Sequence, residues 1–414
     1  MPALPLVEAV LTSILGKISP LCKRQRVVLS HLFALILVRR GRATFVNLAR
    51  FSHFHEHTLR RHFTRTVDWL GLNLAVVRLT RHPRERLIGV FDATFLPKSG
   101  TKTWGLDSFF CSAARAARTG LEVSLVGVVG VESRRAFALG AQQTPAGLGG
   151  GSGDEPNRMD VYLAQVTACL PRLPDVRHWV ADGNYARIKI FEGLGAHKRH
   201  LVTRLRGDAD LRFLAVPQAQ PRPVGRPRTY DGKVSFGDLS RFECVGALDD
   251  QSHVLLYHAV VNSPHFKRDL AVVVLVNERT GGHVVLCSTD TAQPPDEIVA
   301  YYRLRFQLEF VIHWAGAGPD AKQHTGLSEC QARDEAKLAF HVNLSVAAVG
   351  VLRLVSARAG VSLRSLRREA YNAAVVSRTL SQLGLEAESG VMSAALRPVL
   401  LLGSLRRTRS LTPL

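Results

Sequence analysis

Two short apolar segments that each lead into an aspartate constrain the fold of this chain most strongly. Residues 87–91 precede Asp92, and residues 176–181 precede Asp182. Apolar runs of this length, bounded by turn residues, are typical of buried strands. The sequence therefore predicts a sheet in which two carboxylates lie at strand ends, where they could act as metal ligands.

The segments around these two runs predict further strands and a helix. Strand-like runs at 121–131 and 135–139 follow the first aspartate and predict an antiparallel meander, and residues 158–170 form a predicted helix before the second aspartate. The glycine-rich stretch before that helix lacks a following G-K-[ST] sequence, so it is not a phosphate-binding loop. The pattern predicts an α/β fold with a mixed sheet and flanking helices.

Three side chains of different chemistry share one face of a third predicted element. Tyr302, Arg305 and Glu309 lie at offsets of three and four residues, so on a helix they project from the same side. An aromatic ring, a guanidinium group and a carboxylate in this arrangement form a surface suited to phosphate groups.

This spacing resembles the Tyr-x2-Arg-x3-Glu-x6-Lys signature of bacterial insertion-sequence transposases of the cut-and-paste branch. The resemblance implies a ribonuclease-H-like core with an Asp-Asp-Glu triad, here Asp92, Asp182 and Glu309. These three carboxylates would be catalytic and would hold Mg²⁺ as two ions, with Mn²⁺ able to substitute. Arg305 and Lys322 would hold DNA phosphates, and Tyr302 would pack against the DNA end. Taken singly, each aspartate could equally be an ordinary strand terminator or helix cap.

The spacing departs from the signature in one place. Twelve residues separate Glu309 from Lys322, whereas the signature has six, and the excess corresponds to the W-A-G-A-G-P segment at 314–319. Two glycines and a proline predict that the first helix ends near His313 and that Asp320 begins another. Two alternatives to a working transposase therefore stay open: an inactive or regulatory DNA-binding derivative, and a ribonuclease-H-like nuclease without strand transfer.

The charge balance fits a polyanionic partner. The chain of 414 residues has 54 Lys plus Arg against 34 Asp plus Glu, which gives a formal net charge of +20. The resemblance implies double-stranded DNA, both transposon terminal inverted repeats and target DNA, as the partner. It also implies a homodimer in the synaptic complex.

The N-terminal region predicts a helix-turn-helix element. Two helices are expected at 45–51 and 56–69, and Leu59 begins a buried stripe on the second. Arg60 and Arg61, with the neighbouring His62 and Arg65, lie off that stripe and could contact DNA. A helical bundle with a solvated basic face is the alternative. His53, His55 and His57 are interpreted as turn or DNA-backbone residues rather than as zinc ligands.

A long gap between Asp182 and Glu309 predicts an insertion. Strand-like runs at 253–261, 270–276 and 283–287 indicate an all-β insertion, which related transposases carry at this point. The basic loop before these runs contains Arg226 and Arg228, and its G-R-P-R sequence resembles the core of minor-groove AT-hook peptides. An ordinary basic connection with nonspecific phosphate contacts is the favoured interpretation of this loop.

These observations together predict the organisation of the chain. A helical DNA-binding domain (1–80) precedes a ribonuclease-H-like core in two parts (81–205 and 291–350), which a β-rich insertion (206–290) interrupts, and a basic helical region (351–414) follows. Six scattered cysteines suggest neither a zinc site nor a disulfide framework. No membrane segment is expected, because the apolar run at 28–38 is too short to span a bilayer. We therefore expect a cytoplasmic, nucleoid-associated bacterial protein.

Overall fold

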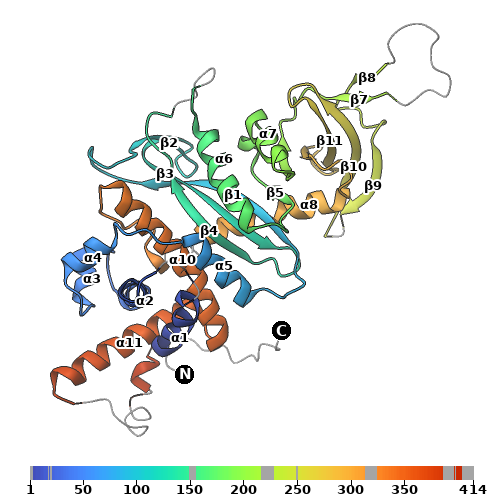
Figure 1. Ribbon diagram of the computed structural model, residues 1–414. Helices are drawn as coiled ribbons and strands as arrows, with labels where there is room; N and C mark the ends of the chain where they lie inside the picture. Colours follow the sequence, from blue (N-terminus) through green and yellow to red (C-terminus); the bar gives the residue numbers. More distant parts are fainter. Residues whose placement is uncertain are drawn as a thin grey trace.

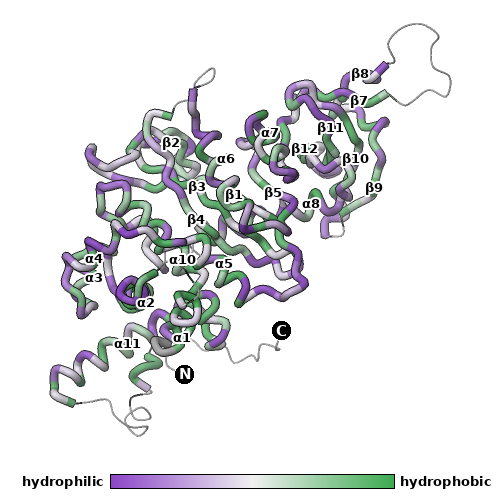
Figure 2. The backbone as a smooth tube through the Cα atoms, viewed as in Figure 1, coloured by the Kyte–Doolittle hydropathy of each residue, from purple (hydrophilic) through white to green (hydrophobic). Residues whose placement is uncertain are grey.

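The computed structural model describes residues 3–16, 18, 21–148, 155–215, 228–248, 250–312, 324–385, 396 and 398–402. Its framework is one large mixed sheet in the order β2-β3-β1-β5-β6-β12-β11-β10-β7-β8, with β4 paired to β3 and β9 paired to β10. The central strands are largely hydrophobic (Figure 2). The N-terminal helices lie at one end of the molecule and the strands β7–β12 at the other (Figure 1).

The strands are β1 (Leu87–Pro97), β2 (Asp107–Cys111), β3 (Ala116–Gly130), β4 (Ala136–Gln143), β5 (His178–Val180), β6 (His200–Leu205), β7 (Arg212–Leu214), β8 (Tyr230–Lys233), β9 (Glu243–Leu248), β10 (Gln251–Ser263), β11 (Arg268–Asn277) and β12 (His283–Ser288). The helices are α1 (Ala3–Leu15), α2 (Lys23–Val38), α3 (Phe45–Arg50), α4 (Glu56–His62), α5 (Trp69–Thr80), α6 (Arg158–Cys169), α7 (Ile188–Ala196), α8 (Pro295–Leu304), α9 (Phe306–Ile312), α10 (Glu335–Ala359) and α11 (Leu363–Gln382), with 3₁₀ turns η1 (Leu170–Arg172) and η2 (Gly183–Tyr185).

The predicted meander is present, but its first strand is longer than expected. β1 pairs antiparallel with β3 over its whole length, from Leu87 opposite Gly130 to Pro97 opposite Gly120. The prediction that the strand ends at Asp92 is therefore wrong. The long partner strand β3 continues the hydrogen-bonded ladder past the aspartate, and the short strand β2, which the sequence analysis missed, extends the sheet beyond β3.

Helices cover both faces of the central strands. On one face α6 and α7 pack against residues such as Phe91 and Trp179. On the other face α8, α9 and α10 pack against residues such as Val90 and Val180. Because successive side chains of a strand point to opposite faces, this two-sided burial explains why the β1 and β5 segments are almost continuously apolar. A mixed sheet between helical layers is consistent with a ribonuclease-H-like fold.

A third core joins the N-terminal helices to the C-terminal ones. Buried residues of α1 and α2, among them Leu11 and Phe33, pack with Val351 of α10 and Leu366 of α11. Helix α10 is long and apolar enough to cross a membrane, but 83% of its most apolar window is buried inside the protein. It therefore serves here as a core helix that contacts both the sheet and the N-terminal helices.

The second helix of the predicted helix-turn-helix element is shorter than expected. α4 ends at His62, and Trp69 belongs to the next helix, which Asp68 caps by accepting a hydrogen bond from the Gly71 amide at 2.9 Å. The predicted stripe is buried at Leu59 and Phe63. The prediction that His62 belongs to an exposed basic face is wrong, because His62 is only 8% exposed and faces the core.

The strands of residues 206–290 extend the central sheet. β12 pairs antiparallel with β6 and with β11, and β11 pairs with β10, so a continuous ladder links this β-rich region to the core strands. The three predicted strands correspond to β10, β11 and β12, each longer than expected.

We expect Gly89→Ala to lower the free energy of unfolding by about 1–3 kcal/mol, because it overfills the core between β1 and β5. A Cβ atom on Gly89 would lie 2.3 Å from the ring of Trp179, which is fully buried. Denaturant titration would measure the change, with Gly282→Ala in an exposed turn as the matched control. Equal stability of the two variants would contradict this account of the packing.

Candidate functional site

The register between β1 and β5 brings the two predicted aspartates side by side. Gly89 pairs with Trp179 and Val90 with Val180 in parallel, so Asp92 and Asp182 occupy equivalent positions two residues further along. Asp182 follows the end of β5 and begins the 3₁₀ turn η2, with its backbone in an extended conformation. Thr203 on β6 fixes this turn by donating a hydrogen bond to the Asp182 carbonyl at 3.0 Å.

Helices α8 and α9 bring the third carboxylate to the same place. The predicted single helix is interrupted at Arg305, which lies between them. The Arg305 guanidinium donates to Glu309 Oε1 at 2.6 Å and to Asp92 Oδ2 at 3.2 Å. Its side chain is only 7% exposed, whereas Asp92 and Glu309 are 24% and 29% exposed. Arg305 therefore bridges two of the predicted triad carboxylates.

Two tyrosines contact the aspartates from opposite sides. The Tyr302 hydroxyl donates to Asp182 Oδ1 at 3.3 Å, and the Tyr185 hydroxyl lies 3.4 Å from Asp92 Oδ1. Burial raises the pKa of Tyr302 to about 12, with Asp182 adding to the rise against the opposing effect of Arg305. Burial, with a smaller contribution from Asp92, also raises the pKa of Tyr185 well above its ordinary value. Both tyrosines are therefore neutral hydrogen-bond donors to the carboxylates.

Burial also affects the pKa of one of the carboxylates, Asp92. It raises the pKa of Asp92 to about 6, with Arg305 opposing the rise and Glu309 and Asp182 adding to it. Burial lowers the pKa of Arg305, but the neighbouring carboxylates outweigh this effect and raise it overall. Arg305 Nε is buried and has no hydrogen-bond partner among the described residues, so the guanidinium keeps a donor for another group.

The donor types at this site suit a hard divalent cation, although their present arrangement does not enclose one. Mg²⁺ prefers carboxylate oxygens and keeps several waters, so Asp92, Asp182 and Glu309 supply the appropriate atoms. Within the described part of the chain, no group of three or more His, Cys, Asp or Glu is placed to hold a metal ion. Arg305 instead pairs with Asp92 and Glu309. The residues fit a metal by chemistry, provided that this guanidinium moves away.

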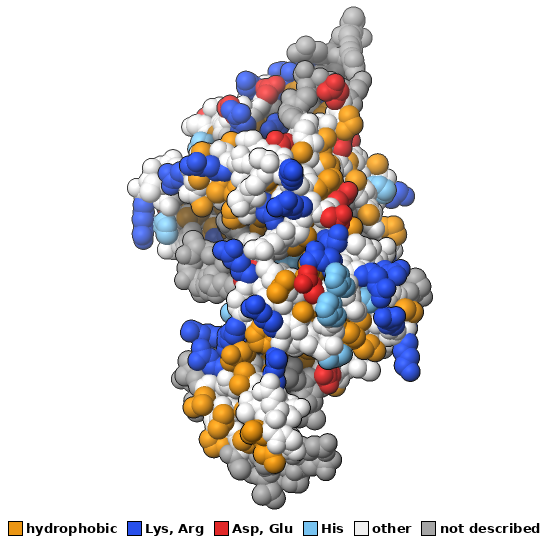
Figure 3. Space-filling model, turned by 90° about the vertical axis from the view of Figure 1, so that its left-hand side faces the viewer, with side chains coloured by type: hydrophobic (Ala, Val, Ile, Leu, Met, Phe, Trp, Pro, Cys, Tyr) orange, Lys and Arg blue, Asp and Glu red, His pale blue; other side chains and the backbone are white. Residues whose placement is uncertain are grey.

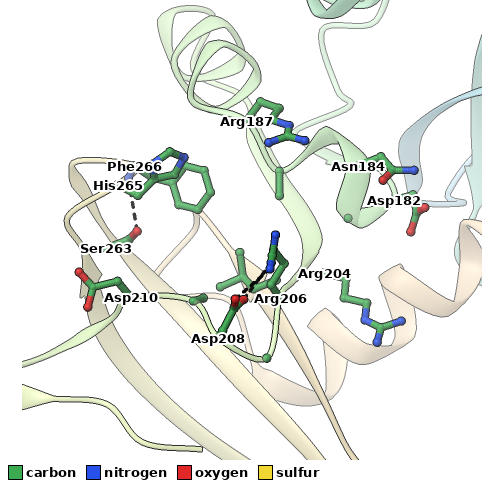
Figure 4. A pocket seen from close by; sticks show the side chains of 15 residues that line it. Asp182, Asn184, Arg187, Arg204, Arg206, Asp208, Asp210, Ser263, His265 and Phe266 are labelled. Atoms are coloured by element: carbon green, nitrogen blue, oxygen red, sulfur yellow. Dashed lines mark hydrogen bonds and ion pairs between the residues drawn. The ribbon is translucent and has the colours of Figure 1, made fainter. Parts of the chain in front are cut away.

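An open hollow adjoins Asp182. Its volume is about 670 Å³, and three segments line it: residues 182–187, residues 204–210 and residues 263–266. Figure 4 shows Asp182 and Asn184 on one side of the hollow and His265 and Phe266 on the other, with Arg187, Arg204 and Arg206 around it. No role was predicted for these arginines from the sequence. Single arginines in a basic chain give no local signal, and only the packing of the three segments brings them together.

The predicted DNA-contacting residues on α4 lie on the surface, away from the carboxylates. Arg60 pairs with Glu56 and lies over the Phe45 ring, with the Arg60 Cζ atom 4.9 Å from the ring centroid. Arg61 is exposed. On the face that carries α3 and α4, Lys and Arg side chains outnumber Asp and Glu (Figure 3). Arg228 forms an ion pair with Asp231 at 3.0 Å beside β8.

Several of the sequence predictions fall where the structure gives no description. Arg226, Lys322, the segment 314–319, and the predicted helix end at His313 and helix start at Asp320 lie outside the described residues. The predicted histidine cluster is described: the His31 and His53 rings lie 4.4 Å apart, and the His55 and His57 rings stack at 5.2 Å. None of these histidines belongs to a metal-binding group among the described residues.

A large mixed sheet with flanking helices, and Asp92 and Asp182 in equivalent positions of neighbouring strands, are consistent with the class of DDE-type nucleases. The chain belongs to the DDE superfamily endonuclease family, whose model matches residues 21–253. This match covers more than half of the 414 residues and includes Asp92 and Asp182, but it ends before Glu309. No curated protein matches the sequence. Membership supports a transposase-like nuclease that acts on DNA, and endonucleases of this kind generally use divalent metal ions.

Proposed function

We propose that this protein is a DNA transposase that cuts at the ends of its own mobile element and joins them to target DNA. The observation that carries the proposal is the convergence of Asp92, Asp182 and Glu309 on Arg305 and Tyr302. The offsets of Tyr302, Arg305 and Glu309 are those of the insertion-sequence signature, which favours the cut-and-paste branch.

The three carboxylates would hold the divalent cation, Mg²⁺ or Mn²⁺, as two ions. When bound, such ions activate the attacking hydroxyl and stabilise the leaving oxygen in an in-line displacement. Arg305 would exchange its contacts with Asp92 and Glu309 for the scissile phosphate, which can accept hydrogen bonds from the guanidinium fork. Tyr302 would hold Asp182 in place and pack against the DNA end, and Lys322 would contact a neighbouring phosphate.

The remaining parts of the proposal concern the partners. The exposed side of α4, with Arg60 and Arg61, would contact the terminal inverted repeats, and Arg226 and Arg228 would add nonspecific phosphate contacts. A homodimer would assemble the synaptic complex in the bacterial cytoplasm, in association with the nucleoid. The high positive charge of the chain supports these assignments.

The test is a cleavage assay on the DNA that naturally flanks the gene. Purified protein would be incubated with a plasmid that carries the gene and its natural flanking DNA, with Mg²⁺, with Mn²⁺, or with a chelator. Strand breaks at the flanks that require the metal, together with sequenced joined products, are the expected result. Breaks without joined products would favour a nuclease without strand transfer, and DNA binding without breaks would favour a regulatory derivative.

We expect Arg305→Gln to bind Mn²⁺ more tightly than the wild type, by roughly tenfold, while cleaving DNA more slowly. The substitution removes a positive charge that lies 2.6 Å from Glu309 and 3.2 Å from Asp92, and that competes with a cation for both carboxylates. Electron paramagnetic resonance of free Mn²⁺ would measure the affinity without requiring activity.

Two controls make this result specific. Arg305→Lys retains the charge and should keep the wild-type affinity. Arg303→Gln removes a nearby arginine that instead pairs with Asp250 at 2.9 Å and should also have no effect. An unchanged or lower affinity in folded Arg305→Gln would show that the guanidinium does not compete with the cation.

A further inference from the structure

We propose that the hollow beside Asp182 binds the backbone phosphates of one DNA strand, through Arg187 and Arg204. The proposal rests on the proposed function, because it assigns the path of the DNA strand next to the carboxylates. It adds a site next to Asp182 that the signature residues do not include.

The position of the hollow supports this assignment. Asp182 is itself part of the lining, so the hollow opens directly onto the carboxylate site. Arg204 precedes the end of β6, and its carbonyl oxygen would lie 3.1 Å from a Cβ atom on Gly183, which shows how closely the two segments approach. Arg187 is the N-cap residue of α7 on the other side of η2. A strand whose scissile bond lies at Asp182 would therefore pass between these two arginines.

The charged side chains around the hollow also support a phosphate ligand. Among the charged side chains that line the hollow, Arg206 is held by Asp208 through two hydrogen bonds of 2.8 Å, and Asp210 lies 3.5 Å from Lys233. The exposed side chains of Arg187 and Arg204 form no hydrogen bond or ion pair with any other described residue. The exposed ring of His265 faces the same space. The lining as a whole contains three arginines and three aspartates, and its third aspartate, Asp182, accepts a hydrogen bond from the Tyr302 hydroxyl but forms no ion pair with a described residue. The hollow thus has two guanidinium groups that are not held in ion pairs, and each can accommodate a phosphate.

The size and the side chains of the hollow favour contacts with the backbone of a DNA strand. The volume of about 670 Å³ is in the range of pockets that hold a small organic molecule, enough for roughly one or two nucleotides. Besides the exposed His265, the lining has one other aromatic ring, that of Phe266, which is only 6% exposed and stacks on Phe191 with the ring centroids 4.0 Å apart. It therefore presents little surface for stacking with a base. The hollow should therefore bind the phosphate backbone independently of the base sequence.

The experiment compares the salt dependence of binding. A fluorescently labelled single-stranded oligonucleotide would be titrated with full-length wild type and with the Arg187→Gln/Arg204→Gln double variant, in chelator and at several salt concentrations. The slope of log K against log salt is negative, and each lost phosphate contact makes it less steep by about 0.7. The slope of the double variant should therefore be less steep than that of the wild type by about 1.4. Arg84→Gln, which alters an exposed arginine in the turn before β1, is the matched control and should keep the wild-type slope.

A second measurement identifies the group that is recognised. The difference between wild type and double variant should persist when the oligonucleotide sequence is changed, and should vanish when its backbone phosphates are replaced by neutral methylphosphonates. A wild-type slope in the folded double variant would overturn the proposal, as would a difference that follows the base sequence.

The binding assay separates this inference from the proposed function, because it needs neither metal nor cleavage. Cleavage by the wild type together with an unchanged slope in the double variant would refute the phosphate site alone. A reduced slope together with no metal-dependent cleavage by the wild type would refute the transposase function and retain the phosphate site.

Discussion

Replacing Asp92 with asparagine is expected to reduce metal-dependent DNA cleavage by at least about a thousandfold, since the change removes an anionic ligand from a two-ion phosphoryl-transfer site. Asp92 lies beside Asp182 in the β1–β5 register and contacts Arg305 at 3.2 Å. The side-chain volume is almost unchanged, so the loss should come from the charge rather than from packing. Rates of strand breakage at the element's flanks would measure it.

The matched control is Asp175→Asn, which alters an exposed aspartate in the turn before β5. This variant should cleave at the wild-type rate. Asp182→Asn and Glu309→Gln should fail as Asp92→Asn does, and circular dichroism should show that all of them are folded. Substantial cleavage by folded Asp92→Asn would exclude Asp92 from the metal-binding set, and the assignment of the site would then be wrong.

The largest effect on stability is expected for Trp179→Ala, with a loss of about 3–5 kcal/mol in the free energy of unfolding. Trp179 is fully buried on β5, where it packs close to Gly89 and lies 6.4 Å from the Phe91 ring, measured between centroids. Its removal leaves a cavity at the junction of β1 and β5, which sets the register of the two aspartates. Chemical denaturation monitored by circular dichroism would measure the loss.

The comparison with Trp179→Phe makes the origin of the effect clear. Phenylalanine keeps an aromatic ring in the same place, so the loss should be clearly smaller than for alanine. Because Trp179 Nε1 has no hydrogen-bond partner among the described residues, neither substitution breaks a side-chain hydrogen bond there. Similar losses for both variants would show that packing at this position does not dominate the stability of the core.

Local pattern was enough to find most of the central elements. The apolar runs before Asp92 and Asp182 correspond to β1 and β5. The predicted helix at 158–170 corresponds to α6 and is one residue longer than it. Strand ends were less predictable, because they depend on the partner strand. β1 continues to Pro97 only because β3 supplies a ladder of the same length.

The environment of the site could not be deduced in the same way. The helical offsets placed Tyr302, Arg305 and Glu309 on one face, but they did not show that Arg305 pairs with Asp92, 213 residues earlier in the chain. Likewise, His62 was predicted to be exposed from its helical position, and packing of the N-terminal helices buries it. Long-range contacts of this kind depend on how elements dock, which short-range periodicity does not encode.

The sequence by itself therefore determined the order of the carboxylates, the alternation of strands and helices, and the basic character of the chain, because these are properties of composition and local spacing. The tertiary structure alone decided the register that places Asp92 beside Asp182, the bridging position of Arg305 and the arginine-lined hollow. These features arise from hydrogen-bonded pairing and core packing between segments that are distant in the chain, and these interactions fix relative positions only once the whole sheet has formed.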